Sequence, residues 1–461
     1  MATVFTRSFM MFPNITSNDQ LKISVKSDGH NISLWNTPSK DLVGGTVLRF
    51  PINIDKDFQR GVAGDDLAYV ATENQANPFI YYGTANCYLM VGTGSGSANI
   101  DVTPYVANRF YEQQTQEAGT ALPQSAAVIW KESTMGTITV GNIITAQKRF
   151  NVTVNNGYGN ALIGIYSGAN GTGNLLWSYH IWKTEDDPQT TIPYNVTNSG
   201  SYAVMPMALG ATKKSTKASA AGDKVKSCGL YYQWGRKDPL GRPNALPASG
   251  NSYVTVQDKN GTAFAADYWT NANVKELSDN AANNGILVGV NQTADGFELD
   301  RYMIDYAVKN PTVFIKVPNG TYNNDWAGVT NNNLWANPEG YNYPEQSQLR
   351  GRSVFDPCPT GYHVAPKDLW INFSQTRANT TVPAEFNVSN YVDNTSISTD
   401  KGYSFYINNW KTGDEDFYPA SGYRNYTSGA LTAVGAYGFC WSSAPHTSTA
   451  AGGMAFTATL V

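Results

Sequence analysis

The sequence is poor in charged residues, and this scarcity excludes some classes of protein. Charged side chains make up 15% of its 461 residues, whereas about 25% is usual in soluble domains. The 32 basic and 36 acidic residues give a formal net charge of −4, and no long basic run stands out. Because nucleic-acid binding needs a concentrated basic surface, we expect no nucleic-acid partner.

Residues suited to catalysis or metal binding are also few. The sequence contains four cysteines and four histidines: Cys87, Cys228, Cys358, Cys440, His30, His180, His363 and His446. No cysteine pair has the spacing of a zinc site, and no histidine lies in a recognisable catalytic motif. These absences predict no metal ion, no cofactor and no enzymatic activity. We expect buried thiols and packed histidines, although an even cysteine count also permits two disulfides.

Two acidic clusters are candidates for calcium binding, at residues 414–416 and at Asp295, Glu298 and Asp300. Calcium requires several oxygen ligands that converge from a loop of fixed pattern. Neither cluster has that pattern. We therefore expect both to be solvated acidic loops.

Long apolar segments are absent as well. No stretch reaches the roughly 18 apolar residues of a membrane-spanning helix, so we expect no membrane span. The first 17 residues, MATVFTRSFMMFPNITS, contain only short apolar runs, which are too brief for a signal peptide. Either an export signal has been removed, or the protein is not exported by the general route.

The sequence is rich in turn-forming residues and short alternating strands. Hydrophobic residues make up 41% and aromatic residues 12% of the chain, which is ample for packed cores. Apolar and polar residues alternate at 21–25, 137–142 and 148–154, and apolar runs occupy 161–166 and 175–182. Turn signals at 28–29, 155–157 and 170–171 separate such runs. This pattern predicts an N-terminal β region over 1–66 and a β-sandwich over 67–200.

The pattern changes after residue 200, where glycine, asparagine, tryptophan and tyrosine become frequent. Two helices are expected at 273–281 and 298–308, the second with an apolar stripe that includes Met303 and Ala307. A third helix is expected to begin near Pro366. We therefore expect a compact, loop-rich α+β domain over 201–461, and an α+β, β-rich fold for the whole chain.

Four segments of this second half resemble one family. They are residues 228–239 (CGLYYQWGRKDP), 353–366 (SVFDPCPTGYHVAP), 419–424 (PASGYR) and 438–443 (GFCWSS). In this order they are similar to C-type-lectin-like domains of Bacteroidota surface proteins, a fold group shared with formylglycine-generating enzymes. Residues 85–90, 161–165 and 176–182 resemble, more weakly, the β-domain of fimbrillin-like surface proteins. One departure is the apolar run 204–211, where the relatives tend to carry charge.

The segment 429–443, GALTAVGAYGFCWSS, resembles more narrowly the variable region of proteins diversified by retroelements. In those proteins a lectin-like frame holds ligand-contacting side chains that adenine-directed mutagenesis changes. The resemblance implies that Gly435, Gly438 and Trp441 hold the frame. It implies twelve ligand-binding positions: Thr432, Ala433, Ala436, Tyr437, Phe439, Cys440, Ala444, His446, Thr447, Gly452, Gly453 and Ala455. Tyr437, Phe439 and His446 are the contacts that we expect to matter most.

These resemblances imply recognition rather than chemistry. The function expected is that of an adhesin on the bacterial outer surface, which binds a protein or glycan receptor on another cell. The alternative is a receptor-binding protein of a phage tail with the same fold. A pilus or tail assembly protein would be a second partner. A formylglycine-type enzyme would depend on Cys358 or Cys440, and neither lies in such an active-site arrangement.

Overall fold

The structure is a computed structural model. It describes residues 21–27, 30–36, 66–70, 85–102, 123–144, 149–197, 200–246, 252–266, 268–278, 286–287, 303–304, 306–318, 324–327, 334–335, 353–377, 380–391, 400–447 and 450–457. For 21–27, 30–36, 66–70, 271, 286–287, 444–447, 450–452 and 457 the description covers the backbone alone.

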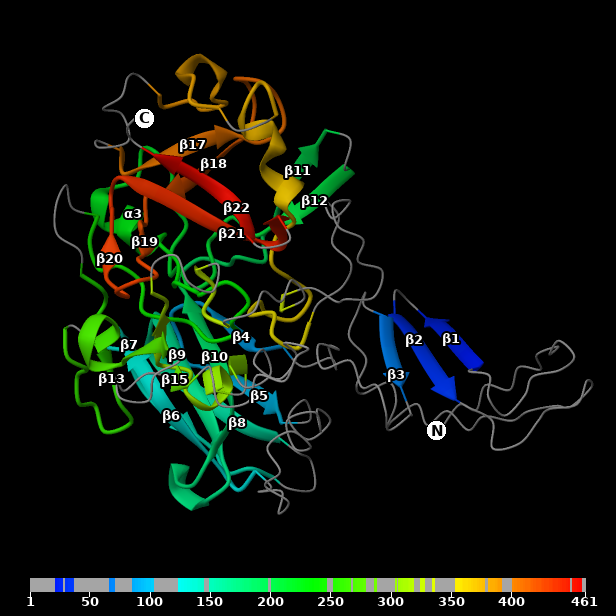
Figure 1. Cartoon of the computed structure of the whole chain (residues 1–461), viewed down its shortest axis with the longest axis vertical. Coiled ribbons are helices and arrows are strands. Elements are labelled where there is room, and N and C mark those ends of the chain that lie inside the picture. The colour runs from blue at the N-terminus through cyan, green and yellow to red at the C-terminus, as the bar shows by residue number, and fades with distance from the viewer. Residues whose placement is uncertain are drawn as a thin grey trace, which may run out of the picture.

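A small sheet near the N-terminus contains β1 (Leu21–Ser27), β2 (His30–Asn36) and β3 (Asp66–Val70). Strands β1 and β2 form an antiparallel hairpin in which Ser27 is paired with His30. The hairpin predicted here is therefore confirmed, although residues 28–29 themselves lie outside the described residues. Strand β3 pairs parallel to β2, and in Figure 1 this sheet lies apart from the remaining strands.

Two further sheets share one apolar core. The first has the order β13-β6-β9-β10-β4, and the second has the order β5-β8-β7. Their bounds are β4 (Cys87–Val91), β5 (Gly96–Asp101), β6 (Ser125–Glu132), β7 (Met135–Val140), β8 (Arg149–Gly157), β9 (Gly159–Tyr166), β10 (Leu175–Thr184) and β13 (Val256–Gln257). Side chains of both sheets, such as Val152 from β8 and Ile163 from β9, meet in this core.

The chain passes from the second sheet to the first at Asn156 and Gly157, whose φ angles are 55° and 68°. Asparagine and glycine are the residues that adopt this left-handed conformation most readily. The next strand, β9, is buried along almost its whole length. Its Ile163 faces the shared core, while Leu162 packs with Trp130 and Trp269 in a second cluster. Both faces of β9 are therefore covered, which explains its continuous apolar sequence.

The prediction of a helix at 273–281 is wrong. Residues Val274–Ser278 form strand β14, which pairs parallel with β16 (Phe314–Lys316) and with β15 (Ile286–Leu287). A helix of this length is marginal on its own, whereas the strand pairs with β16 and buries Leu277. Tertiary context therefore overrides the local pattern. A π-helical turn, Tyr268–Ala272, leads into β14.

The other two helix predictions agree with the described residues. Residues 303–304 and 306–309 are helical, and the predicted stripe residues Met303 and Ala307 are buried. The third becomes a 3-10 helix, η6 (Lys367–Phe373). Short helical segments also occur at η2 (Ala169–Gly171), α3 (Ala221–Lys226) and η7 (Pro383–Glu385).

Three hairpins and η6 form the C-terminal part of the body (Figure 1). Two of them are β11–β12 (Ile192–Val196, Gly200–Val204) and β17–β18 (Gly402–Tyr406, Glu415–Pro419), and the third is β21–β22 (Tyr437–Thr447, Ala450–Thr457). Phe373 of η6 stacks on Phe405 of β17, with ring centroids 4.2 Å apart. Strand β11 adds Tyr194 to this core, so the hairpin that crosses residue 200 packs with later elements. A shorter pair, β19 (Tyr423–Arg424) and β20 (Leu431–Thr432), precedes β21.

A buried polar network joins the first sheet to the second half of the chain. Arg242 donates from Nε and Nη2 to the two carboxylate oxygens of Glu132, at 2.9 and 3.1 Å. Asn160 donates to Glu132 Oε1 at 3.0 Å and lies 2.9 Å from His180 Nε2. His180 is buried, as predicted for a packed histidine, and burial lowers its pKa to about 3.

Loss of the Glu132 carboxylate should destabilise the fold strongly. Glu132→Gln leaves the buried Arg242 guanidinium without its bidentate partner, and breaking such a pair costs about 3–5 kcal/mol. Chemical denaturation would measure the change in the free energy of unfolding. The control is Glu276→Gln, which breaks a half-exposed pair with Lys316 and should cost less than about 1 kcal/mol. Equal losses in the two variants would contradict this account.

Candidate functional site

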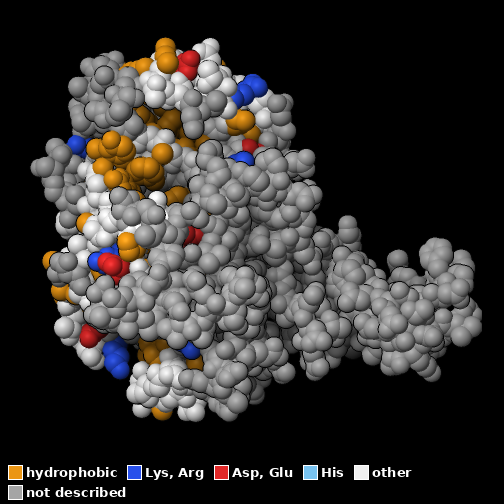
Figure 2. Space-filling model, in the orientation of Figure 1, with side chains coloured by type: hydrophobic (Ala, Val, Ile, Leu, Met, Phe, Trp, Pro, Cys, Tyr) orange, Lys and Arg blue, Asp and Glu red, His pale blue; other side chains and the backbone are white. Residues whose placement is uncertain are grey.

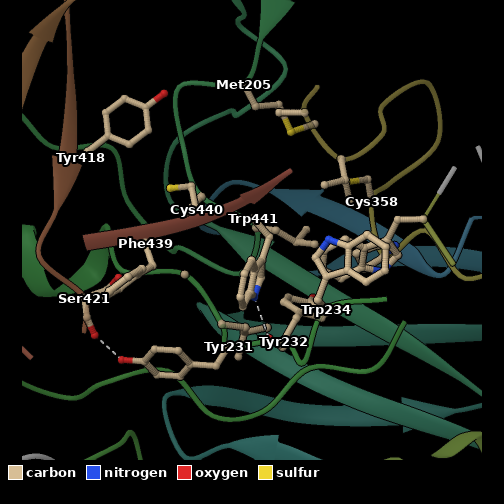
Figure 3. Close-up of a pocket in the computed structure, with 18 of the residues that line it drawn as sticks. Met205, Tyr231, Tyr232, Trp234, Cys358, Tyr418, Ser421, Phe439, Cys440 and Trp441 are labelled. Carbon is tan, nitrogen blue, oxygen red and sulfur yellow. Dashed lines mark hydrogen bonds between the residues drawn. The ribbon is translucent and has the colours of Figure 1, made fainter. Parts of the chain in front are cut away.

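The candidate site begins with the alternating faces of β21. Phe439 and Trp441 lie on one face and are 40% and 44% exposed. The intervening Cys440 pairs with Met454 of β22, and both pack against the C-terminal core. Figure 3 shows the same division, with Phe439 and Trp441 on one side of the strand and Cys440 on the other. The strand therefore presents large aromatic side chains outward while its other face holds the fold.

Aromatic contacts hold Phe439 in place. Its ring is parallel to that of Tyr437, with centroids 6.1 Å apart, as expected for residues i and i+2 of one strand. Tyr423 of β19 meets Phe439 edge-on at 5.2 Å. Such pairs add to the stability that burial alone gives. The three rings form a preorganised apolar surface.

Two tryptophans clasp β21 to residues 232–234. The Trp441 indole N–H donates to the Tyr232 carbonyl at 3.0 Å. In the opposite direction, the Trp234 indole N–H donates to the Ser442 carbonyl at 2.8 Å. We call this reciprocal pair the tryptophan clasp. It agrees with the framing role expected of Trp441, yet it leaves much of that ring exposed.

A cavity of about 910 Å³ surrounds this part of β21. Its wall is dominated by aromatic and sulfur-containing side chains, among them Met205, Tyr232, Trp234, Phe439 and Trp441. Figure 3 shows Met205 and Tyr418 on the Cys440 side of the strand and Tyr231, Tyr232 and Trp234 on the other side. In Figure 2, hydrophobic side chains gather on the surface over the region of β20 and β21. The volume suits a small molecule or a few side chains of a partner.

Two glycines of the C-terminal segment are required by the backbone. Gly435 has a φ of 82°, and its N–H donates to the Ala420 carbonyl at 2.7 Å. At Gly438 a Cβ atom would lie 2.0 Å from the Phe456 ring. Any side chain there would displace β22. Both glycines therefore have the structural role that the sequence predicted.

The structure brings only some of the twelve predicted positions to the exposed face. Phe439, Gly453 and Ala455 are exposed, and Phe439 pairs across the strands with Ala455. Thr432, Ala433, Ala436 and Tyr437 are half-buried around the turn that precedes β21. Cys440 lies on the opposite face. Four further positions belong to β21 and β22, but only their backbone is described: Ala444, His446, Thr447 and Gly452.

Several lining residues escaped the sequence analysis. Tyr231, Tyr232 and Trp234 belong to a segment that was singled out only for its family resemblance, although their aromatic density was a usable signal. Met205 lies in the apolar run 204–211. Because Met205 lines the cavity, this run contributes apolar surface to the wall.

Two expectations about polar residues are wrong. Asp416 is not in a solvated loop, because it is buried in β18 and accepts a hydrogen bond from the Tyr194 hydroxyl at 2.7 Å. His363 is exposed rather than packed. The second acidic cluster, at Asp295, Glu298 and Asp300, lies outside the described residues.

Two of the described thiols, Cys228 and Cys440, have raised pKa values. Burial raises the pKa of Cys440 to about 12, so this thiol is protonated at neutral pH and is a poor nucleophile. Cys228 is a buried free thiol, and its pKa is also raised to about 12 by burial. Among the described residues, no three His, Cys, Asp or Glu side chains are grouped to hold a metal ion. Within the same residues, no helix combines the length and apolar character needed to cross a membrane.

Comparison with known proteins adds no relative: no family model, curated protein or solved structure matches this chain.

The backbone conformation at Ala433 should make alanine less stable there than glycine. Its φ of 55° lies in the left-handed region, which costs an L-residue about 1 kcal/mol. Ala433→Gly should therefore raise the free energy of unfolding by about 0.5–1 kcal/mol, and Ala433→Val should lower it. Denaturant titration would measure both variants. Ala436→Gly, at a position without positive φ, should instead lower stability slightly. A destabilised Ala433→Gly would refute the assigned backbone.

Asp416 should give stability a specific pH dependence. Burial raises its pKa from 3.8 to about 6, so the folded state holds this proton more tightly than the unfolded state. The resulting stability is fully present below pH 3.8 and is lost as the pH rises through about 6. In Asp416→Asn the unfolding free energy should fall less steeply over that window. Exposed Asp414→Asn is the control and should retain the wild-type slope, and equal slopes in all three proteins would exclude Asp416 as the cause.

Proposed function

We propose that the protein is a non-enzymatic, surface-displayed adhesin that binds a receptor through the outward face of β21–β22 and the adjoining cavity. In this proposal residues 67–200 form a β-sandwich and residues 201–461 a C-type-lectin-like domain. The N-terminal part displays the binding face outside the bacterial cell. The family resemblance of the sequence segments supports this assignment.

One observation carries the proposal. Phe439 and Trp441 expose large rings beside an apolar cavity, while the strand that bears them is fixed by the tryptophan clasp and by the packing of Cys440 and Met454. Exposed aromatic side chains on a rigid support give contact area at low entropic cost. Surface hydrophobic residues in a group of this kind mark interaction sites.

Diversification by a retroelement is part of the proposal, and Ala433 supports it. Adenine-directed mutagenesis often starts from asparagine codons, and alanine is reachable from them. Asparagine is among the few non-glycine residues that tolerate a positive φ. The strained alanine at 433 is therefore what a mutated asparagine position would leave.

The alternative is a phage tail receptor-binding protein of the same architecture. The exposed face would serve either carrier equally, because both need a rigid scaffold that tolerates changed contact residues. An antibody to the protein would distinguish the two. It should detect the protein in outer-membrane fractions if the protein is an adhesin, and in purified phage particles if it is a tail protein.

Sequencing this gene across a population is the test of the binding face. We expect substitutions to concentrate at Phe439 and the other outward or turn positions, namely 432, 433, 436, 437 and 455. Gly453 should not vary, because a Cβ atom there would lie 2.4 Å from the Cys440 carbonyl oxygen. Gly435, Gly438, Trp441 and Trp234 should stay fixed, because each is needed by the backbone or the clasp. An invariant face would remove the retroelement from the proposal, and frequent substitution of the clasp residues would contradict the assigned support.

A further inference from the structure

An acidic side chain of the cavity, Asp325, lies in sequence beside one of the lining tryptophans and is not paired with a basic residue in the described part of the chain. Asp325 lines the cavity next to Trp326, whose indole N–H donates to the Trp234 carbonyl at 2.7 Å. The Asp325 carboxylate accepts the Ala327 N–H at 3.0 Å, and among the described residues it has no ion pair. Burial raises its pKa to about 6.

The N–H groups of the surrounding indoles are already used in hydrogen bonds within the protein. Trp234 and Trp335 lie 5.6 Å apart at a tilt of 51°, and Tyr232 meets Trp335 edge-on. The Trp335 N–H donates to the Arg236 carbonyl at 3.0 Å, and the clasp occupies the N–H groups of Trp234 and Trp441. With its donors satisfied, this cluster offers π-faces, which attract cations.

Two arginines of this region, Arg236 and Arg424, already donate hydrogen bonds to main-chain carbonyls. Arg236 donates to the Val313 carbonyl at 2.7 Å and to the carbonyls of Asn310 and Pro311. Arg424, which also lines the cavity, donates to the Gly429 and Gly241 carbonyls. In the described part of the chain, neither arginine forms an ion pair with Asp325.

The same chain already holds a guanidinium among rings. The Arg424 guanidinium lies 5.2 Å from the Trp269 ring centroid, 5.4 Å from that of Tyr231 and 5.6 Å from that of Tyr253. This fold can therefore stabilise a buried cation with aromatic faces and main-chain carbonyls. Trp234, Trp441 and Asp325 line one cavity, so aromatic rings and a carboxylate are available to a cation there.

We propose that the cavity receives an arginine or lysine side chain of a partner protein, with the cation against Trp234 and Trp441 and Asp325 as its counter-charge. This inference rests on the proposed function and specifies its ligand class. A neutral sugar could donate hydroxyl hydrogen bonds to the Asp325 carboxylate but would supply no counter-charge. A purely apolar side chain would supply neither, and it would bury the charge further at an additional cost.

The test uses the whole protein labelled at its tryptophan indoles, which give 11 N–H signals in an NMR spectrum. The probes are N-acetyl-arginine amide and N-acetyl-norleucine amide, which both have an unbranched aliphatic stem but differ in charge. Trp441→Phe and Trp234→Phe assign the two signals, and the exposed Trp410, outside the cavity wall, serves as an internal reference. We expect the arginine probe to shift the Trp234 and Trp441 signals and to bind about tenfold more tightly than the norleucine probe.

Asp325→Asn should reduce that preference to about twofold or less, because the amide still accepts the Ala327 N–H but has lost the charge. The matched control Asp414→Asn, at an exposed acid, should retain the full preference. Equal affinity for both probes would overturn the cationic ligand and leave the binding face in place. Failure of both probes to move the two signals would also overturn it, while the proposed function is judged separately by where the gene varies.

Discussion

The tryptophan clasp is the constraint on which the candidate site depends. Two indole N–H groups, from Trp234 and Trp441, each donate to a carbonyl of the other segment. The two residues are far apart in sequence, so the clasp fixes the position of β21 against residues 232–234. Because both donors are satisfied within the protein, neither ring needs a ligand to complete its hydrogen bonding. The rings can therefore stay exposed without an unsatisfied polar group.

One face of β21 packs against the core of the C-terminal part, and the other face is exposed. On the inner side, Cys440 and Met454 pack with the aromatic C-terminal core, and Gly438 leaves room for Phe456. On the outer side, Phe439 can be exchanged for another residue without loss of a core contact. A strand offers this separation directly, because successive side chains point to opposite faces. Changes on one face of such a strand cost little stability on the other.

The sequence predicted local structure well where short-range patterns decide it. The hairpin at residues 28–29 and the buried strand β9 follow from turn chemistry and apolar runs. Strand β14 could not be predicted, because its partner β16 is about 40 residues away and supplies the hydrogen bonds that outweigh helix propensity. Burial of Asp416 was hidden for a similar reason, since its donor Tyr194 lies 222 residues away.

The sequence analysis predicted only the part of the candidate site that lies in one continuous segment, residues 432–455. Glycine positions and the exposed Phe439 followed from the resemblance, but the cavity wall did not, because Met205, Trp234 and Asp325 come from separate stretches that only the folded chain unites. Cys440 shows the limit most clearly. It lies between two exposed aromatic residues in sequence, and strand alternation places it on the opposite face.

Strand β13 has a consequence for how such a protein can evolve. Val256 and Gln257 belong to the later half of the chain, yet they form the edge of the sheet built by the earlier half. A recombination breakpoint near residue 200 would separate this strand from β6 and divide Arg242 from Glu132. Exchange of the whole C-terminal half between genes would therefore cost stability that point changes on the outward face of β21 would not.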